Sequence, residues 1–169
     1  MGIRERKIRE KEQLRQQILD AARELFFEEG YGNVSMRKVA EKIEYSPTTI
    51  YLYFKNKTDL LIAISENILN DLLDTLQALS EDSRDPLRNL RSSAKAYAEF
   101  GLSHPKDFEL IFIIRPQYQE GLRLTEGSAG ERAFRYLRTM VSECVRQNKF
   151  RQADVETTAQ ALWSAMHGV

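Results

Sequence analysis

The sequence contains a single cysteine, Cys144, and no apolar run long enough to cross a membrane. One cysteine cannot form a disulfide within the chain, which fits a reducing cytoplasm. The charged N-terminus does not resemble a signal peptide, so we predict a cytoplasmic protein without membrane contact. His104, His167 and Cys144 are too scattered along the chain to predict a metal site, and no feature of the sequence predicts a cofactor.

Motifs of enzymes are also missing. The chain has no glycine-rich phosphate loop, no nucleophile elbow and no paired-histidine zinc motif. We therefore predict no catalytic residue and expect that the chain is not an enzyme. An enzyme with an all-helical body is the rival class, and a small-molecule activity that depends on one polar residue would reveal it.

The net charge of the chain is zero, but the charge is unevenly distributed. Residues 1–57 contain 12 Lys and Arg against 9 Asp and Glu, whereas residues 58–169 contain 13 against 16. The N-terminal part is therefore basic by three charges. The basic part of the chain is the part that would meet DNA phosphates. Charge asymmetries of this size are also common by chance.

Apolar residues recur at helical spacing along the whole chain, and no alternating strand pattern of useful length is present. We predict an all-α fold with a helix-turn-helix domain over residues 1–56 and a helical body over 57–169. The expected helices cover residues 12–29 (with an extension to Arg4), 36–43, 47–54, 57–79, 86–103, 105–114, 130–147 and 154 onward.

The segment from Ser35 to Lys57 predicts two short helices joined by a tight turn. Ser35 and Ser46 are placed to cap them, and Pro47 suits the first turn of the second helix. That second helix carries Thr48, Thr49, Tyr51 and Tyr53, which are hydroxyl-bearing residues of the kind that reach base edges in the major groove.

An ordered pattern across the first third of the chain resembles the TetR family of bacterial transcriptional regulators. It begins with ILDAARELF at residues 18–26 and Gly30-Tyr31. It continues through Ser35-x-Arg37-x-Val39-Ala40 and ends with TIYxYFxNKxxLL at residues 49–61. The resemblance implies a homodimeric regulator, usually a repressor, that binds palindromic double-stranded operator DNA and is released by a small-molecule effector.

The resemblance also assigns DNA-contact positions. Phosphate contacts fall on Ser35, Arg37, Tyr53 and Lys57. From their place on the second helix, mostly in its N-terminal half, we expect base contacts at Pro47, Thr48, Thr49 and Tyr51. The chain departs from the family at Glu44 and near Thr48, where glycine is common. We expect either a left-handed backbone at Glu44 or a slightly different turn, and an operator that cannot be copied from a relative.

The expected ligand-binding residues are the aromatic and histidine side chains of the body helices. These are Tyr97, Phe100, Phe108, Phe112, Tyr136, Trp163 and His167. Few charges interleave with them, which favours an apolar effector, although each is individually more typical of a packed core. Trp163-x-x-x-His167-Gly168 resembles a Trp-His-Gly type of TetR C-terminal domain. Trp163 and His167 could line a ligand pocket, or they could be a packed aromatic residue and a hydrogen-bonded histidine near a helix interface. The second interpretation is favoured.

Three questions stay open at this point. Residues 1–15 are either a basic arm for DNA or a solvated helix end with internal ion pairs. The apolar pattern still runs at Val169, so we expect the dimer-forming end of the family fold to be incomplete or disordered. Finally, a helix-turn-helix protein that binds DNA without a ligand, as an architectural factor, is the alternative to a ligand-responsive regulator.

Overall fold

The computed structural model describes residues 2–81, 84–114, 126–150 and 154–167. These residues form helices and turns, and no strand occurs among them, so the predicted all-α class is confirmed. They divide into two compact units. The head contains the chain up to Ser65 together with the segment that begins at Leu110, and the body contains Glu66–Glu109 and the chain from Gly121 onward.

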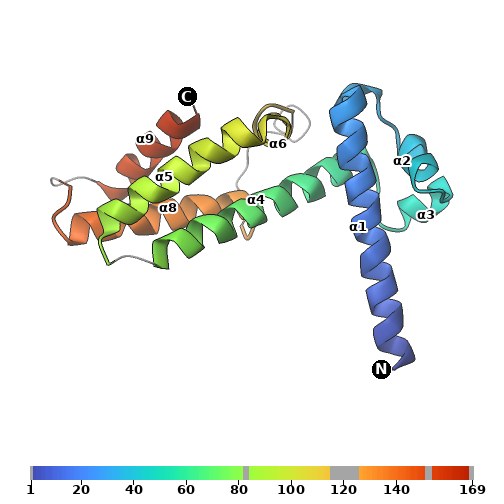
Figure 1. Cartoon of the computed structure of the whole chain (residues 1–169), viewed down its shortest axis with the longest axis horizontal. Helices are drawn as coiled ribbons and strands as arrows, with labels where there is room; N and C mark the ends of the chain where they lie inside the picture. The colour runs from blue at the N-terminus through green and yellow to red at the C-terminus, as the bar shows by residue number, and fades with distance from the viewer. Residues whose placement is uncertain (1, 82–83, 115–125, 151–153, 168–169) are drawn as a thin grey trace. The chain divides into compact units, whose positions relative to one another are not determined.

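The head is built from a long first helix, two short helices and the start of a second long helix (Figure 1). Their bounds are α1 (Ile3–Glu29), the 3₁₀ turn η1 (Tyr31–Asn33), α2 (Met36–Lys42), α3 (Pro47–Tyr51) and α4 (Lys57–Glu81). Gly30 ends α1 as predicted, with a φ of 79° and its N–H bonded to the carbonyl of Phe26 at 3.1 Å. α1 begins at Ile3, so the longer of the two expected extents is the correct one.

One face of each head helix is buried in a shared core. The apolar side chains of α1 to α4 in the head that are at most 3% exposed are Ile18, Leu19, Ala22, Phe26, Val39, Ala40, Ile50, Leu60, Leu61 and Ile64. They come from α1, α2, α3 and α4 at helical spacing, as the periodicity predicts. Burying each larger aliphatic side chain contributes about 1.5–3 kcal/mol, so this core fixes the short helices α2 and α3 that propensity alone would leave marginal.

The body packs α5 (Pro86–Ser103), α6 (Pro105–Glu109), α8 (Ala129–Arg146) and α9 (Val155–His167) together with the second part of α4. Asp85 caps α5, Ser128 caps α8 and Asp154 caps α9 through bonds to backbone N–H groups. The cap at Asp154 confirms the predicted start of the last helix.

The apolar stripe of α8 lies in the core of the body itself. Leu137, Val141 and Cys144 pack with Leu90 of α5 and Ala159 of α9. Cys144 is fully buried, and burial raises the pKa of its thiol, so it packs as a core residue. This stripe of α8 is therefore covered within the body itself.

The predicted helix over residues 105–114 changes geometry half-way. Residues 105–109 are α-helical, but Leu110–Ile114 form a π-helical turn, η2. Three of its five residues are β-branched isoleucines, which have a slightly lowered α-helix propensity. The expected loop after Arg115 lies outside the described residues as far as residue 125.

Candidate nucleic-acid interface and body cavity

The turn between α2 and α3 has the geometry that a helix-turn-helix requires. Ser35 caps α2 by accepting from the N–H of Lys38, and Ser46 caps α3 by accepting from the N–H of Thr49, each at 3.2 Å. Glu44 has a φ of 60°, which confirms the expected left-handed backbone at the position where the family commonly has glycine. The predicted caps and turn are therefore all present.

The polar residues of α3 differ in how far they reach solvent. Thr48 is exposed, and Tyr51 is 54% exposed, on a helix whose opposite side carries the fully buried Ile50. Thr49 is half-buried, and its hydroxyl lies 2.9 Å from that of Ser46, so it belongs to the cap. Thr48 and Tyr51 are the α3 residues best placed to reach the edges of bases.

The candidate phosphate contacts also lie in two kinds of surroundings. Arg37 is exposed at the start of α2 and is paired with Glu41 one turn later at 2.8 Å. Tyr53 is half-buried after the end of α3. An exposed pair of this kind is weak, so Arg37 can exchange Glu41 for a phosphate at little cost.

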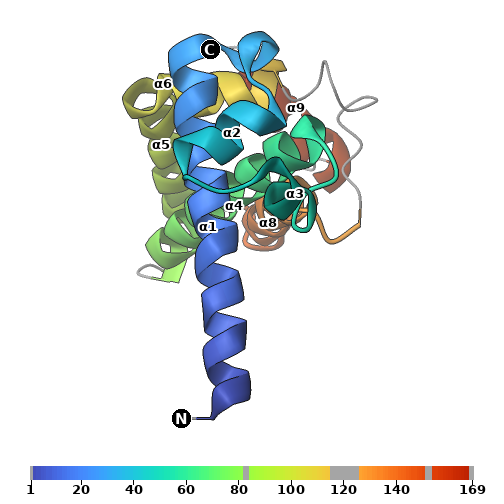
Figure 2. The same ribbon diagram turned by 90° about the vertical axis from the view of Figure 1, so that its right-hand side faces the viewer.

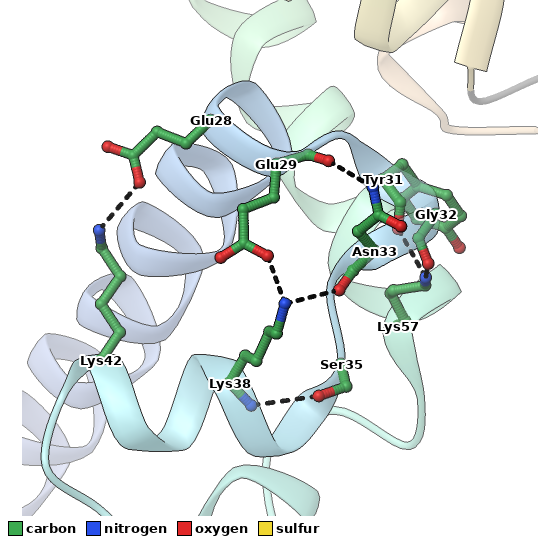
Figure 3. A network of polar contacts seen from close by, with 9 residues as sticks. All are labelled: Glu28, Glu29, Tyr31, Gly32, Asn33, Ser35, Lys38, Lys42 and Lys57. Atoms are coloured by element: carbon green, nitrogen blue, oxygen red, sulfur yellow. Dashed lines mark hydrogen bonds and ion pairs between the residues drawn. The ribbon is translucent and has the colours of Figure 1, made fainter.

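Lys57, by contrast, is held inside the head (Figure 3). Its Nζ donates to the carbonyl oxygens of Tyr31 at 2.6 Å and of Gly32 at 3.3 Å, and it lies 4.3 Å from the centre of the Tyr31 ring. Burial lowers the pKa of Lys57. These contacts tie the start of α4 to the turn that follows α1, a role that no sequence pattern predicted.

Two further lysines of α2 are occupied by acidic residues of α1 (Figure 3). Lys38 pairs with Glu29 and donates to the carbonyl of Asn33, while Lys42 pairs with Glu24 at 3.0 Å and with Glu28 at 3.6 Å. The hydrogen bond with Glu24 raises the pKa of Lys42. Much of the basic charge of α2 is thus neutralised within the head.

In the body, an apolar cavity of about 240 Å³ lies at the surface formed by α5, α6 and α9. Its lining residues are Tyr97, Ala98, Gly101, Leu102, Phe108 and Met166. The ring of Phe108 packs directly on the backbone of Gly101, so closely that a Cβ there would be 3.3 Å from the ring. Two of the predicted ligand-binding residues, Tyr97 and Phe108, therefore line one cavity.

The hydroxyl of Tyr97 is oriented by the last helix. His167 Nδ1 lies 2.8 Å from the carbonyl oxygen of Trp163, which can only accept, so Nδ1 is the donor. In the neutral imidazole His167 Nε2 then accepts from the Tyr97 hydroxyl at 3.2 Å. Burial raises the pKa of Tyr97, which keeps this donor protonated.

The other predicted ligand-binding residues do not line this cavity. Trp163 packs edge-on against Phe134, with 5.7 Å between ring centres, as the packed-aromatic interpretation predicts. Phe100 stacks on His104, and Tyr136 donates to the carbonyl of Leu76 at 2.7 Å. Phe112 is a half-buried residue of η2.

The described residues contain no group of acidic, histidine or cysteine side chains that would hold a metal ion. Within the same residues, no helix has the length and apolar character needed to span a bilayer.

Comparison with known proteins agrees with this geometry. A model of the bacterial regulatory proteins of the tetR family matches residues 18–64, and a model of the tetracyclin repressor-like C-terminal domain matches residues 90–169. The two matches together span more than half of the chain. The chain belongs to the TetR family.

Individual TetR relatives are regulators of transcription, not enzymes. The chain is 30% identical over 95 residues to the fatty acid metabolism regulator protein of Bacillus subtilis, covering 56% of this chain and 44% of that protein. It is 23% identical over 128 residues to the transcriptional activator FasR of Mycolicibacterium smegmatis, covering 73% and 58%. The chain thus spans about half the length of these relatives.

Solved structures share the TetR fold. The fatty acid degradation regulator FadR of Bacillus halodurans superposes with a TM-score of 0.78 at 21% identity, covering 91% of this chain and 80% of that one. FadR of Bacillus subtilis, solved with stearoyl-CoA, gives 0.69 at 20% identity, covering 90% and 83%. The expected family and fold are confirmed.

Proposed function

We propose that the chain is a cytoplasmic homodimeric repressor that binds a palindromic operator and releases it when a small apolar effector enters the body. The observation that carries this proposal is the capped α2–α3 pair, from which Thr48 and Tyr51 project within the part that matches TetR DNA-binding domains. The C-terminal match over residues 90–169 supports a regulatory body in the same chain.

The proposed base readers are the exposed side chains of α3. Thr48 and Tyr51 reach base edges, while Pro47 and Thr49 shape the helix start that enters the major groove. The proposed phosphate contacts are Ser35, Arg37, Tyr53 and Lys57, which lie at helix starts or follow α3.

A dimer is proposed because α3 is short. Pro47–Tyr51 exposes few side chains, so one head reads only a few base pairs, and a two-fold pair of heads doubles the site and makes it palindromic. Light scattering of the protein with and without operator tests this step. A monomer under both conditions would contradict it.

The cavity of the body is the proposed effector site. At about 240 Å³ it is larger than a cavity of about 150 Å³ known to hold benzene, and slightly below the range of drug-sized pockets. It therefore suits a compact apolar molecule or one end of a longer one. Tyr97 is the lining residue with a polar side-chain group, so the ligand is apolar with at most one polar contact. The resemblance to a fatty acid metabolism regulator supports the same class.

The switch would act through linkage between the two sites. An effector lowers DNA affinity only if it binds preferentially to one state of the dimer. In that state the α3 helices of the two subunits no longer match successive major grooves. Operator DNA must then weaken effector binding by the same factor, typically about 1–3 kcal/mol of coupling. α4 is the natural connection because its residues belong to both units.

The test is binding to DNA flanking the chain's own gene, by footprinting and calorimetry, with and without apolar ligands such as medium-chain fatty acids. We expect one high-affinity palindromic footprint that weakens when ligand binds, and transcription that rises at the same time. Footprints spread over many sequences, with no ligand effect, would instead favour the ligand-independent architectural class. A palindrome whose occupancy raises transcription would replace repression by activation.

A further inference from the structure

The N-terminal half of α1 is a helix without a packing partner in the head. Every side chain from Arg4 to Gln13 is exposed, and the first fully buried residue is Ile18. Figures 1 and 2 show this part of α1 extending beyond α2 and α3. Three turns of helix therefore stand in solvent with all their faces available.

The charges on these turns are sorted by face. Arg4, Lys7, Lys11 and Arg15 follow one another at intervals of three, four and four residues, so they form one basic stripe along the helix. No ion pair with a described residue is formed by Arg4, Lys7 or Lys11.

The acidic residues of the same turns lie off the stripe. Glu10 pairs with Arg6 at 2.8 Å, and Glu5 accepts from the N–H of Gly2 at 2.9 Å. Glu12 lies one residue past Lys11, about 100° around the helix. The stripe therefore keeps its positive charge, whereas Arg6 on another face has its own carboxylate.

One contact fixes the direction in which the stripe faces. The guanidinium of Arg15 lies over the ring of Phe54, 5.4 Å from its centre. Phe54 follows Tyr51, the last residue of α3, by three positions. The basic stripe thus starts beside the end of α3 and continues along the exposed turns of α1.

We propose that the stripe Arg4–Lys7–Lys11–Arg15 binds phosphates of duplex DNA outside the base pairs read by α3. This inference rests on the proposed DNA-binding function and adds a second contact surface to it. At about 1.5 Å per residue the stripe is roughly 16 Å long, which corresponds to about half a turn of B-DNA. Charge complementarity selects this partner, since Ile8 is the one large apolar residue from Arg4 to Gln13 and offers no apolar seam for a protein.

The test compares two double variants that remove equal charge from the same turns. Lys7→Gln with Lys11→Gln removes the centre of the stripe. Arg6→Gln with Arg9→Gln removes two charges from the opposite side of the helix. Glutamine has a helix propensity similar to lysine and arginine, and circular dichroism checks that both variants keep the helicity of the parent protein.

Each protein is titrated with a duplex selected from a random-sequence library, in a long form and in a form trimmed to the palindrome. We expect the Lys7/Lys11 variant to lower the slope of log affinity against log salt by up to about 1.8 per subunit on the long duplex. The Arg6/Arg9 variant should keep the parental slope. On the trimmed duplex all three proteins should bind alike.

Equal losses in both variants would overturn the stripe, because only overall charge would matter. The stripe would also be overturned if neither variant lowered the salt slope, or if the affinity of the parent protein did not depend on duplex length. If the parent selects no sequence and binds no duplex, the proposed function itself fails, and the stripe fails with it. Specific parental binding with unchanged slopes sinks the stripe alone.

Discussion

The ammonium group of Lys57 lies 2.6 Å from the carbonyl oxygen of Tyr31 and 4.3 Å from the centre of its ring. Lys57 begins α4, and Tyr31 begins the turn after α1, so one side chain joins two elements that are 26 residues apart. A lysine amine has three N–H donors, and the carbonyls of Tyr31 and Gly32 take two of them. One donor is left for a DNA phosphate.

Lys57→Met should therefore change both stability and DNA binding. The apolar stem still packs, but the charged hydrogen bonds to the carbonyls of Tyr31 and Gly32 are lost, at a cost of about 1.5–3 kcal/mol in the free energy of unfolding. If the third donor meets a phosphate, the salt slope of DNA binding falls by about 0.9 per subunit. Urea denaturation and salt titration measure the two effects independently.

Lys55→Met is the matched control, since Lys55 is exposed two residues earlier and its removal changes net charge equally. We expect little loss of stability from this variant. A Lys57 variant as stable as the Lys55 variant would mean that the carbonyl contacts contribute nothing. An unchanged salt slope would restrict Lys57 to a structural role.

Sequence patterns predicted the helices and their caps well because these depend on neighbouring residues. Ser35, Ser46 and Asp154 each accept from a backbone N–H three residues later, which is a purely local relationship. The left-handed backbone at Glu44 was one of two alternatives suggested by the glycine that the resembled family commonly has at this position.

Long-range contacts were beyond sequence reasoning. Nothing around Lys57 indicates that its amine returns to the turn after α1. The cavity likewise depends on α6 and α9 meeting α5, so periodicity could propose aromatic candidates but could not separate Tyr97 and Phe108 from those packed elsewhere. The π-helical turn at Leu110–Ile114 departs from the 3.6-residue period on which the helix prediction rested.

The exposed side chains of α3 should carry sequence preference. Tyr51→Phe removes one hydroxyl, and Thr48→Ala removes another with a methyl group, and neither residue is part of the α3 cap. We expect each change to weaken binding to the preferred operator by about 1–3 kcal/mol where a base contact is lost, and to relax the preference at that position. Competition binding with operators altered at single positions measures both effects.

Tyr45→Phe provides the control for the tyrosine change. Tyr45 is also exposed, but it lies in a groove between α1 and the turn that Asp20, Glu24 and Lys42 also line, so carboxylates outnumber amines there. Its loss of a hydroxyl should leave operator affinity unchanged. If the Tyr45 variant weakens binding as much as the Tyr51 variant, the assignment of α3 as the base-reading helix is wrong.

Filling the cavity should separate effector response from DNA binding. Ala98 lines the cavity from an exposed position of α5, so Ala98→Leu adds apolar volume there without entering the core. We expect apolar ligand affinity to fall at least tenfold, about 1.4 kcal/mol, while operator affinity without ligand stays within twofold. Calorimetry with the most responsive fatty acid and operator titration give the two values.

Ala78→Leu makes the same chemical change at an exposed position of α4 that does not line the cavity. This control should keep both the ligand affinity and the release of DNA. A parental ligand affinity in the Ala98 variant would show that the effector binds elsewhere in the body.

The cap of α9 should make stability depend on pH. The carboxylate of Asp154 accepts from the N–H of Thr157 at 2.7 Å, and this backbone hydrogen bond lowers the pKa of Asp154 in the folded state. A carboxyl with a lowered folded pKa adds stability that is fully present above its unfolded pKa, about 3.9. That stability is lost as the pH falls through the folded value.

Two substitutions at Asp154 separate the charge of this cap from its hydrogen bond. Asp154→Asn retains a good cap but cannot titrate and lacks the negative charge that favours a helix start. We therefore expect the parent to have a higher melting temperature than the Asp154→Asn variant at pH 7, with a difference that shrinks steadily below about pH 4. The Asp154→Ala variant should melt lowest at pH 7, because it has neither charge nor cap. Calorimetry of the three proteins between pH 7 and pH 3 measures these differences, and a parent-to-Asn gap that stays constant across that interval would contradict a titrating cap at α9.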